Sequence, residues 1–166
     1  MPQLSRFSLS YDAPEDRIAW DAEDVGGAVT RLWLTQRLCR DFVAALVPRL
    51  PKPAAAAAPE HEAAIQSWEQ AAAMASFGST PGVSFPAEAA AGLVRTVHIA
   101  PTPDKVTLVF ETAVGEPAAI TLDGAALRQM LAVLFALHRA AAWPTDFWPD
   151  WIAAQPATAE GAPALN

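Results

Sequence analysis

The sequence is poor in cysteine and in long apolar runs, and each shortage excludes a class of protein. A single cysteine, Cys39, among 166 residues excludes an internal disulfide framework and fits a reducing compartment. No apolar run approaches the ~20 residues of a membrane-spanning helix, and the N-terminus lacks the basic start and apolar core of a secretion signal. We therefore expect a folded, cytoplasmic protein without a membrane partner.

Basic residues are also scarce, because 11 Lys and Arg stand against 18 Asp and Glu, for a formal net charge of −7. Such a balance disfavours wholesale binding to phosphate backbones or anionic membranes. Alanine is abundant instead, with 38 residues, and nine Arg accompany only two Lys. This composition is typical of a GC-rich bacterial genome.

Recognisable catalytic and metal-binding patterns are missing as well. The histidines, His61, His98 and His138, lie far apart in the sequence, which does not favour a zinc site. We interpret His98 as an outward residue of a strand and His138 as a surface or boundary residue of the last helix. No nucleophile elbow, dinucleotide fingerprint or Walker-type lysine occurs. The sequence predicts a protein that is not an enzyme and has no cofactor or metal.

Two weaker signals for chemistry have simpler interpretations. Arg37 and Arg40 flank Cys39 and could lower the pKa of its thiol, but a small residue at the core boundary is the preferred interpretation. The acidic residues at 15–16 and 21–24 could bind a hard cation, yet they lack the spacing of a calcium loop. Solvated hairpin tips explain them better.

The chain divides into two units with the same order of elements. Alternating apolar residues predict three short strands before one helix in each unit, with Thr35 and Asp123 as the helix N-caps. We expect an α+β fold of internally duplicated β-β-β-α units with mainly antiparallel strands. The expected divisions are a first unit (1–50), a linker (51–59), a connecting helix and loop (60–91), a second unit with an aromatic C-terminal segment (92–152) and a disordered tail (153–166).

A constant offset supports the duplication, because 104 minus 16 is 88 and the same offset relates many other positions. Turn, strand, glycine and cap keep this phase, which two unrelated β-β-β-α units need not do. The matched pairs are Asp16 and Asp104, Ile18 and Val106, Trp20 and Leu108, Gly27 and Gly115, Thr35 and Asp123, and also Leu9 and Val97, and Tyr11 and Ile99.

Residues 60–77 predict a helix that joins the two units. Ile65, Trp68, Ala72 and Phe77 fall near one face, and nothing breaks the stretch before residue 78. We expect the indole of Trp68 to cover part of the shared core.

A basic stripe follows the third strand of the first unit. Arg31, Arg37 and Arg40 lie there, although positive charge at a helix start is unfavourable with the helix dipole. Contact with an acidic partner or a phosphate would account for that cost. With Trp20 and Trp33, these residues are the candidate nucleic-acid contacts.

Residues 143–152 contain three Trp and one Phe, and two prolines prevent a regular helix there. The segment either folds over the core as a lid or presents its rings to a partner, since Trp-rich segments are typical interface anchors. We expect Trp143 to belong to a lid, and Phe147, Trp148 and Trp151 to bind a partner.

Three stretches, residues 10–18, 31–38 and 69–81, resemble a family of small bacterial proteins without assigned function. That resemblance implies no activity. The repeated unit is also similar, in topology alone, to duplicated single-strand binders of the Whirly/PC4 type, which have four strands before the helix and basic or aromatic sheet faces. Three strands and an acidic chain depart from that pattern.

The leading hypothesis is therefore a non-catalytic interaction or adaptor protein that acts through protein contacts, with an unidentified protein partner and possible homo-oligomers. The alternative is a single-stranded nucleic-acid binder that uses the arginines and tryptophans of the basic stripe.

Overall fold

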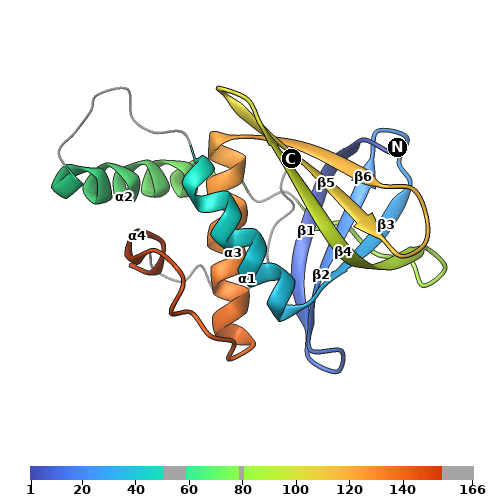
Figure 1. Cartoon of the computed structure of the whole chain (residues 1–166). Helices are drawn as coiled ribbons and strands as arrows, with labels where there is room; N and C mark the ends of the chain where they lie inside the picture. Colours follow the sequence, from blue (N-terminus) through green and yellow to red (C-terminus); the bar gives the residue numbers. More distant parts are fainter. Residues whose placement is uncertain (51–58, 79–80, 155–166) are drawn as a thin grey trace.

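The computed structural model describes residues 1–50, 59–78 and 81–154, which form one six-stranded sheet and a group of helices (Figure 1). The fold is α+β, as expected. The elements are β1 (Leu4–Asp12), β2 (Arg17–Asp24), β3 (Val29–Leu34), α1 (Gln36–Leu46), the 3-10 turn η1 (Val47–Arg49), α2 (Pro59–Ala75), β4 (Ala90–Pro101), β5 (Lys105–Thr112), β6 (Ala118–Asp123), α3 (Gly124–Ala140) and α4 (Asp150–Ala153). Residues 51–58 of the expected linker lie outside the described residues, and so do residues 155–166 of the expected tail.

The sheet runs in sequence order from β1 to β6. Strands are antiparallel within each unit, whereas β3 and β4 pair in parallel where the units meet, with Thr30 beside Ala90. A parallel bridge between Gln3 and Ala119 joins the residue before β1 to β6. The sheet thus curves back on itself, and its concave side holds the core (Figure 1).

The last two strands of each unit pair in the same register. Trp20 lies opposite Leu32, and at the expected offset of 88 Leu108 lies opposite Ile120. Each helix also begins as expected, since the side chains of Thr35 and Asp123 accept hydrogen bonds from backbone amides three residues later. The two units are therefore alike in geometry, and their origin by duplication stays a prediction.

The first strands of the units do not follow the offset of 88, and that part of the prediction is wrong. Leu9 pairs with Trp20, but its expected match Val97 pairs with Phe110, and Ile99 occupies the place beside Leu108. The reason is the length of chain around the first turn: ten residues separate Leu9 from its partner Trp20, whereas eight separate Ile99 from its partner Leu108. Both strands nevertheless carry a register shift at the same point, after Leu4 in β1 and after Val94 in β4.

Gly27 and Gly115 turn the chain between the second and third strands of their units. Their φ angles are +84° and +103°, a region that L side chains rarely adopt. We expect Gly27→Ala and Gly115→Ala each to lower the free energy of unfolding by about 1–2 kcal/mol, measured by chemical denaturation. Gly78→Ala, which has open space around it, is the control and should change stability by less than ~0.5 kcal/mol. Clearly unequal losses at the two turns would show that they are not equivalent.

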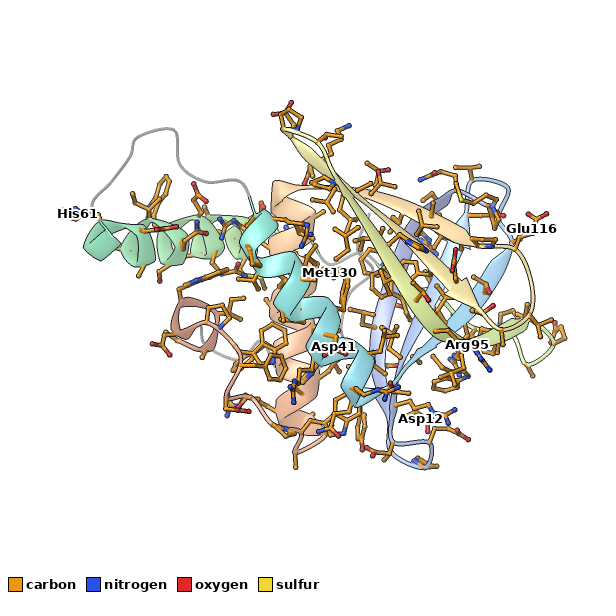
Figure 2. The ribbon with its side chains drawn as sticks, viewed as in Figure 1. Asp12, Asp41, His61, Arg95, Glu116 and Met130 are labelled. Carbon is orange, nitrogen blue, oxygen red and sulfur yellow. The ribbon has the colours of Figure 1, made fainter. Side chains whose placement is uncertain are left out.

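The core lies between the sheet and the helices, where side chains of both units interdigitate (Figure 2). Trp20 is fully buried at its centre, stacked on Phe7 with ring centroids 4.4 Å apart and edge-on to Phe110 at 4.7 Å. Met130 of α3 points into the same space (Figure 2). Helix α1 packs on β4, and α3 packs on β1, so each helix covers the first strand of the other unit. Neither unit can therefore bury its apolar surface without the other.

Within the described part of the chain, no helix combines the length and apolar character that crossing a membrane requires.

Candidate functional site

Arg31, the first candidate for phosphate contact, is already neutralised by a neighbouring strand. Its Nε and Nη2 donate to the two carboxylate oxygens of Asp21 at 2.6 and 2.7 Å. These hydrogen bonds raise the pKa of Arg31. The guanidinium carbon also lies 5.0 Å from the Trp33 ring centroid and 4.1 Å from that of Phe85. A cation held on all these sides is poorly placed to bind a phosphate.

The other candidates of the basic stripe are not brought to one place. Arg37 and Arg40 are exposed on α1, and Trp33 is half-buried beside Arg31 on β3. Trp20 is fully buried, so its assignment to a nucleic-acid contact is wrong. The alternation of side chains along β2 explains the error, because Ile18, Trp20 and Ala22 lie on the face of the strand that points to the core.

The aromatic segment folds back over α3 and is largely a lid. Trp143 and Trp148 are both buried, with Trp148 only 5% exposed, so the expectation that Trp148 is presented to a partner is wrong. Proline prevents a helix in this segment but does not prevent its rings from packing. Phe147 and Trp151 are half-buried against the same core.

His138 is the residue that this lid surrounds, and its interpretation as a surface or boundary residue is wrong. It is fully buried, and the rings of Trp143, Phe147 and Trp148 approach it edge-to-face at 5.2–5.8 Å. Its Nδ1 lies 2.8 Å from the carbonyl oxygen of Leu134, which fixes Nδ1 as the protonated nitrogen. Its Nε2 has no hydrogen-bond partner among the described residues. Burial lowers the pKa of His138 below its ordinary value of 6.5.

The lowered pKa predicts that acid destabilises the fold through His138. As the pH falls below about 6.5, the unfolded chain takes up a proton that the buried imidazole refuses, so stability falls with pH until the folded pKa is reached. We expect a loss of up to ~1.4 kcal/mol per pH unit, measured by urea denaturation between pH 7.5 and 5. His138→Phe should flatten this dependence, while the exposed-site control His61→Gln should keep it. An unchanged slope in His138→Phe would contradict the assignment.

The start of the lid is tied to the first hairpin through Asp16. Trp143 Nε1 donates to Asp16 Oδ1 at 2.9 Å, and the hydroxyl of Tyr11 donates to the same oxygen at 2.8 Å. These two hydrogen bonds lower the pKa of Asp16. The acidic turn at 15–16 is thus a structural acceptor for the lid rather than only a solvated tip.

Helix α2 is held on α3 by a buried polar cluster that the sequence analysis missed. Arg128 of α3 is 4% exposed, donates to Gln66 Oε1 at 2.6 Å and forms an ion pair with Glu69. Gln70 Nε2 donates to the Arg128 carbonyl oxygen at 3.0 Å, and Gln129 Nε2 donates to the Ala73 carbonyl oxygen at 2.8 Å. The helix is therefore fixed by polar contacts rather than by an apolar stripe.

The face of α2 that points to solvent is the one that was expected to point to the core. Trp68 was expected to cover the core, but it is 73% exposed, because Gln66 and Gln70 occupy the buried face. Four exposed alanines share the outer face with Trp68 at helical spacing: Ala64, Ala71, Ala72 and Ala75. We call these five residues the Trp68 face. Exposed apolar surface on a rigid helix is typical of a binding surface.

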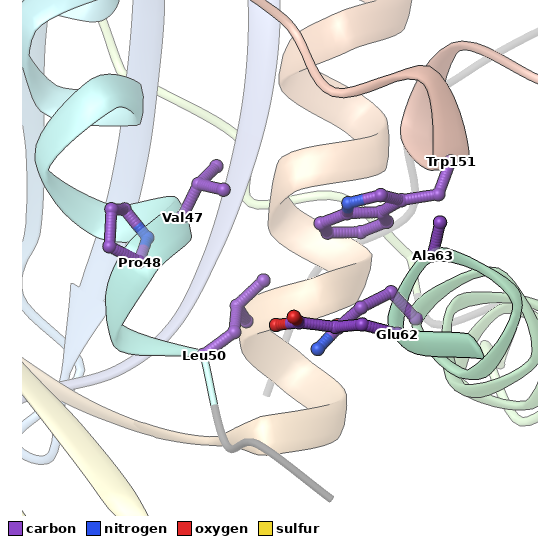
Figure 3. Close-up of a pocket in the computed structure, with 7 residues that line it drawn as sticks. Val47, Pro48, Leu50, Glu62, Ala63 and Trp151 are labelled. Carbon is purple, nitrogen blue, oxygen red and sulfur yellow. The ribbon is translucent and has the colours of Figure 1, made fainter. Parts of the chain in front are cut away.

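A groove lies on the other side of α2, between η1, α2 and α4 (Figure 3). Its volume is about 330 Å³. Its lining residues are mostly apolar: Val47, Pro48, Leu50, Ala63 and Trp151, with Glu62 and Gln66 as the polar members.

The described residues bear on two kinds of chemistry, a reactive cysteine and a metal site. Cys39 is buried, and burial raises the pKa of its thiol to about 12, so it is a core residue and not a nucleophile. No group of three or more histidine, cysteine, aspartate or glutamate side chains converges to hold a metal within those residues. Comparison with protein-family models, with curated proteins and with solved structures finds no match for this chain.

Proposed function

We propose that this chain is a non-catalytic protein-interaction protein that contacts its partner through the Trp68 face of α2. The observation that supports this is the 73% exposure of the Trp68 side chain on a helix that the Arg128 cluster holds in place. Tryptophan is among the residues most enriched at the energetic centres of protein interfaces. Because the helix is already ordered, a partner can bury the indole without the entropic cost of folding α2.

Binding of single-stranded nucleic acid has less support from the same structure. Stacking needs an exposed ring, and phosphate contact needs an available cation. Trp20 does not meet the first requirement because it is fully buried, and Arg31 does not meet the second because Asp21 pairs with it. The remaining support rests on Arg37 and Arg40, which are exposed on α1. We expect a labelled single-stranded oligonucleotide to show no saturable binding at low salt.

Site-specific photo-crosslinking tests the proposed surface. A benzophenone amino acid is placed at position 68 in cells of the source organism, and at Val114, which is 87% exposed in the β5–β6 loop, as the matched control. We expect a discrete adduct at position 68 and none at position 114. Purified parent protein should compete for the adduct, whereas Trp68→Ala protein should not. The same adducts at both positions, or equal competition by both proteins, would contradict the proposal.

A further inference from the structure

The groove between η1, α2 and α4 offers a negative group that the fold does not use. Glu62 lines the groove and makes no ion pair with any described residue. Figure 3 shows its side chain extending from α2 toward Leu50, across the gap from η1. Glu62 is exposed, and its carboxylate stands at the edge of a mostly apolar groove.

Two described cations near this groove have hydrogen-bond partners within the fold. Arg49 of η1 donates to the carbonyl oxygen of Ala45 in α1, and Arg128 is paired with Glu69. Helix α2 itself contains no lysine or arginine. Glu62 is thus the only charged side chain among the described residues that line the groove, and its complement is a cation.

Trp151 supplies the second part of the site. Its indole lines the groove, and the guanidinium carbon of Arg128 lies 5.5 Å from the ring centroid. The ring therefore already makes one cation–π contact, with Arg128. An aromatic ring next to a carboxylate is the combination that a planar guanidinium fits best, because it stacks on one and forms hydrogen bonds with the other.

The remaining walls match the stem of an arginine side chain. Val47, Leu50 and Ala63 are apolar, and the three methylene groups of an arginine can lie against them while its charged end reaches Glu62. A lysine fits less well, because its ammonium group is compact, strongly hydrated and unable to stack.

We propose that this groove binds an arginine side chain presented by a partner protein, with Glu62 as the ion-pair acceptor and Trp151 as the stacking surface. The site lies on the opposite side of α2 from Trp68 and does not depend on the interaction proposed there.

The test is a titration of the isotope-labelled full chain with N-acetyl-arginine amide, followed by NMR. N-acetyl-citrulline amide, which has nearly the same shape without the charge, is the control ligand. We expect saturable chemical-shift changes confined to residues around Leu50, Ala63 and the Trp151 indole. The citrulline compound should bind at least about tenfold more weakly. Equal binding of the two compounds, or shifts spread over the acidic surface, would overturn the proposal.

Two variants with the same charge change separate the site from general attraction to an acidic protein. Glu62→Gln removes the groove carboxylate, and Glu88→Gln removes an exposed carboxylate before β4. We expect about a tenfold loss of binding in Glu62→Gln and parent-like binding in Glu88→Gln. Equal losses in both would overturn the assignment. Crosslinking at position 68 reports on the other side of α2, so its outcome is independent.

Discussion

Trp148→Ala is expected to lower the free energy of unfolding by about 3–5 kcal/mol, enough to remove much of the stability of a protein of this size. The indole is 5% exposed and packs edge-on against Phe135 and His138, with centroids 5.4 and 5.2 Å apart. Its removal leaves a cavity between α3 and the lid. The prolines at 144 and 149 restrict the backbone of the lid and so hinder it from moving in to fill this cavity. The measurement is chemical denaturation of the variant beside the parent.

Trp68→Ala is the matched control, because it deletes the same side chain from the surface. Its unfolding free energy should stay within ~0.5 kcal/mol of the parent value. A stability loss in Trp148→Ala as small as that of the control would show that the lid is not part of the core. A large loss in Trp68→Ala would show instead that the indole is buried in solution, for example against another molecule.

Arg128→Met is expected to cost about 3 kcal/mol, because it removes the donor that satisfies a buried cluster while keeping most of the side-chain volume. Gln66 and Glu69 then lose their hydrogen bonds to the guanidinium at the α2–α3 contact. We expect α2 to loosen before the sheet does, and hydrogen exchange should therefore rise first at residues 66–73.

Arg139→Met provides the control, since Arg139 is an exposed residue of the same helix. It should change stability by less than ~0.5 kcal/mol. Uniform loss of exchange protection over the sheet and α2 in Arg128→Met would contradict the view that the polar cluster holds α2 in particular.

The strands and the helices α1 and α3 could be predicted because their signals are local. Alternation of apolar and polar residues marks each strand, and a capping side chain marks each of these helix starts. Thr35 accepts from the Leu38 amide at 3.3 Å, and Asp123 accepts from the Ala126 amide at 2.8 Å. Such contacts span three residues, so a single sequence contains all the information they need.

The orientation of α2 could not be predicted in the same way. Apolar periodicity placed Trp68 inward, but the buried face is set by Arg128, which lies about sixty residues away in the sequence. Some polar residues are buried only because a partner far away in the sequence forms their hydrogen bonds. Such residues do not contribute to the apolar periodicity from which a buried helix face is predicted. The burial of His138 and Trp148 has the same cause, since a proline-containing segment can fold back in many ways.

One part of the candidate site did carry a readable signal. If a hairpin turn is predicted around Gly27, Asp21 and Arg31 are expected opposite each other on adjacent strands. In the structure they do lie opposite each other and form an ion pair. Opposite charges in directly facing positions are a known source of sheet stability. The arginine could therefore have been assigned to a structural ion pair before any phosphate was considered.

The parallel contact between β3 and β4 has a consequence for synthesis on the ribosome. The strands and helix of the first unit end at Leu46. The strand that covers the open edge of β3 begins only at Ala90, and β6, next to the start of β1, begins at Ala118. At ~5–20 residues per second, the nascent chain carries two unpaired strand edges for several seconds. During that interval the first unit exposes strand edges that can pair with another chain.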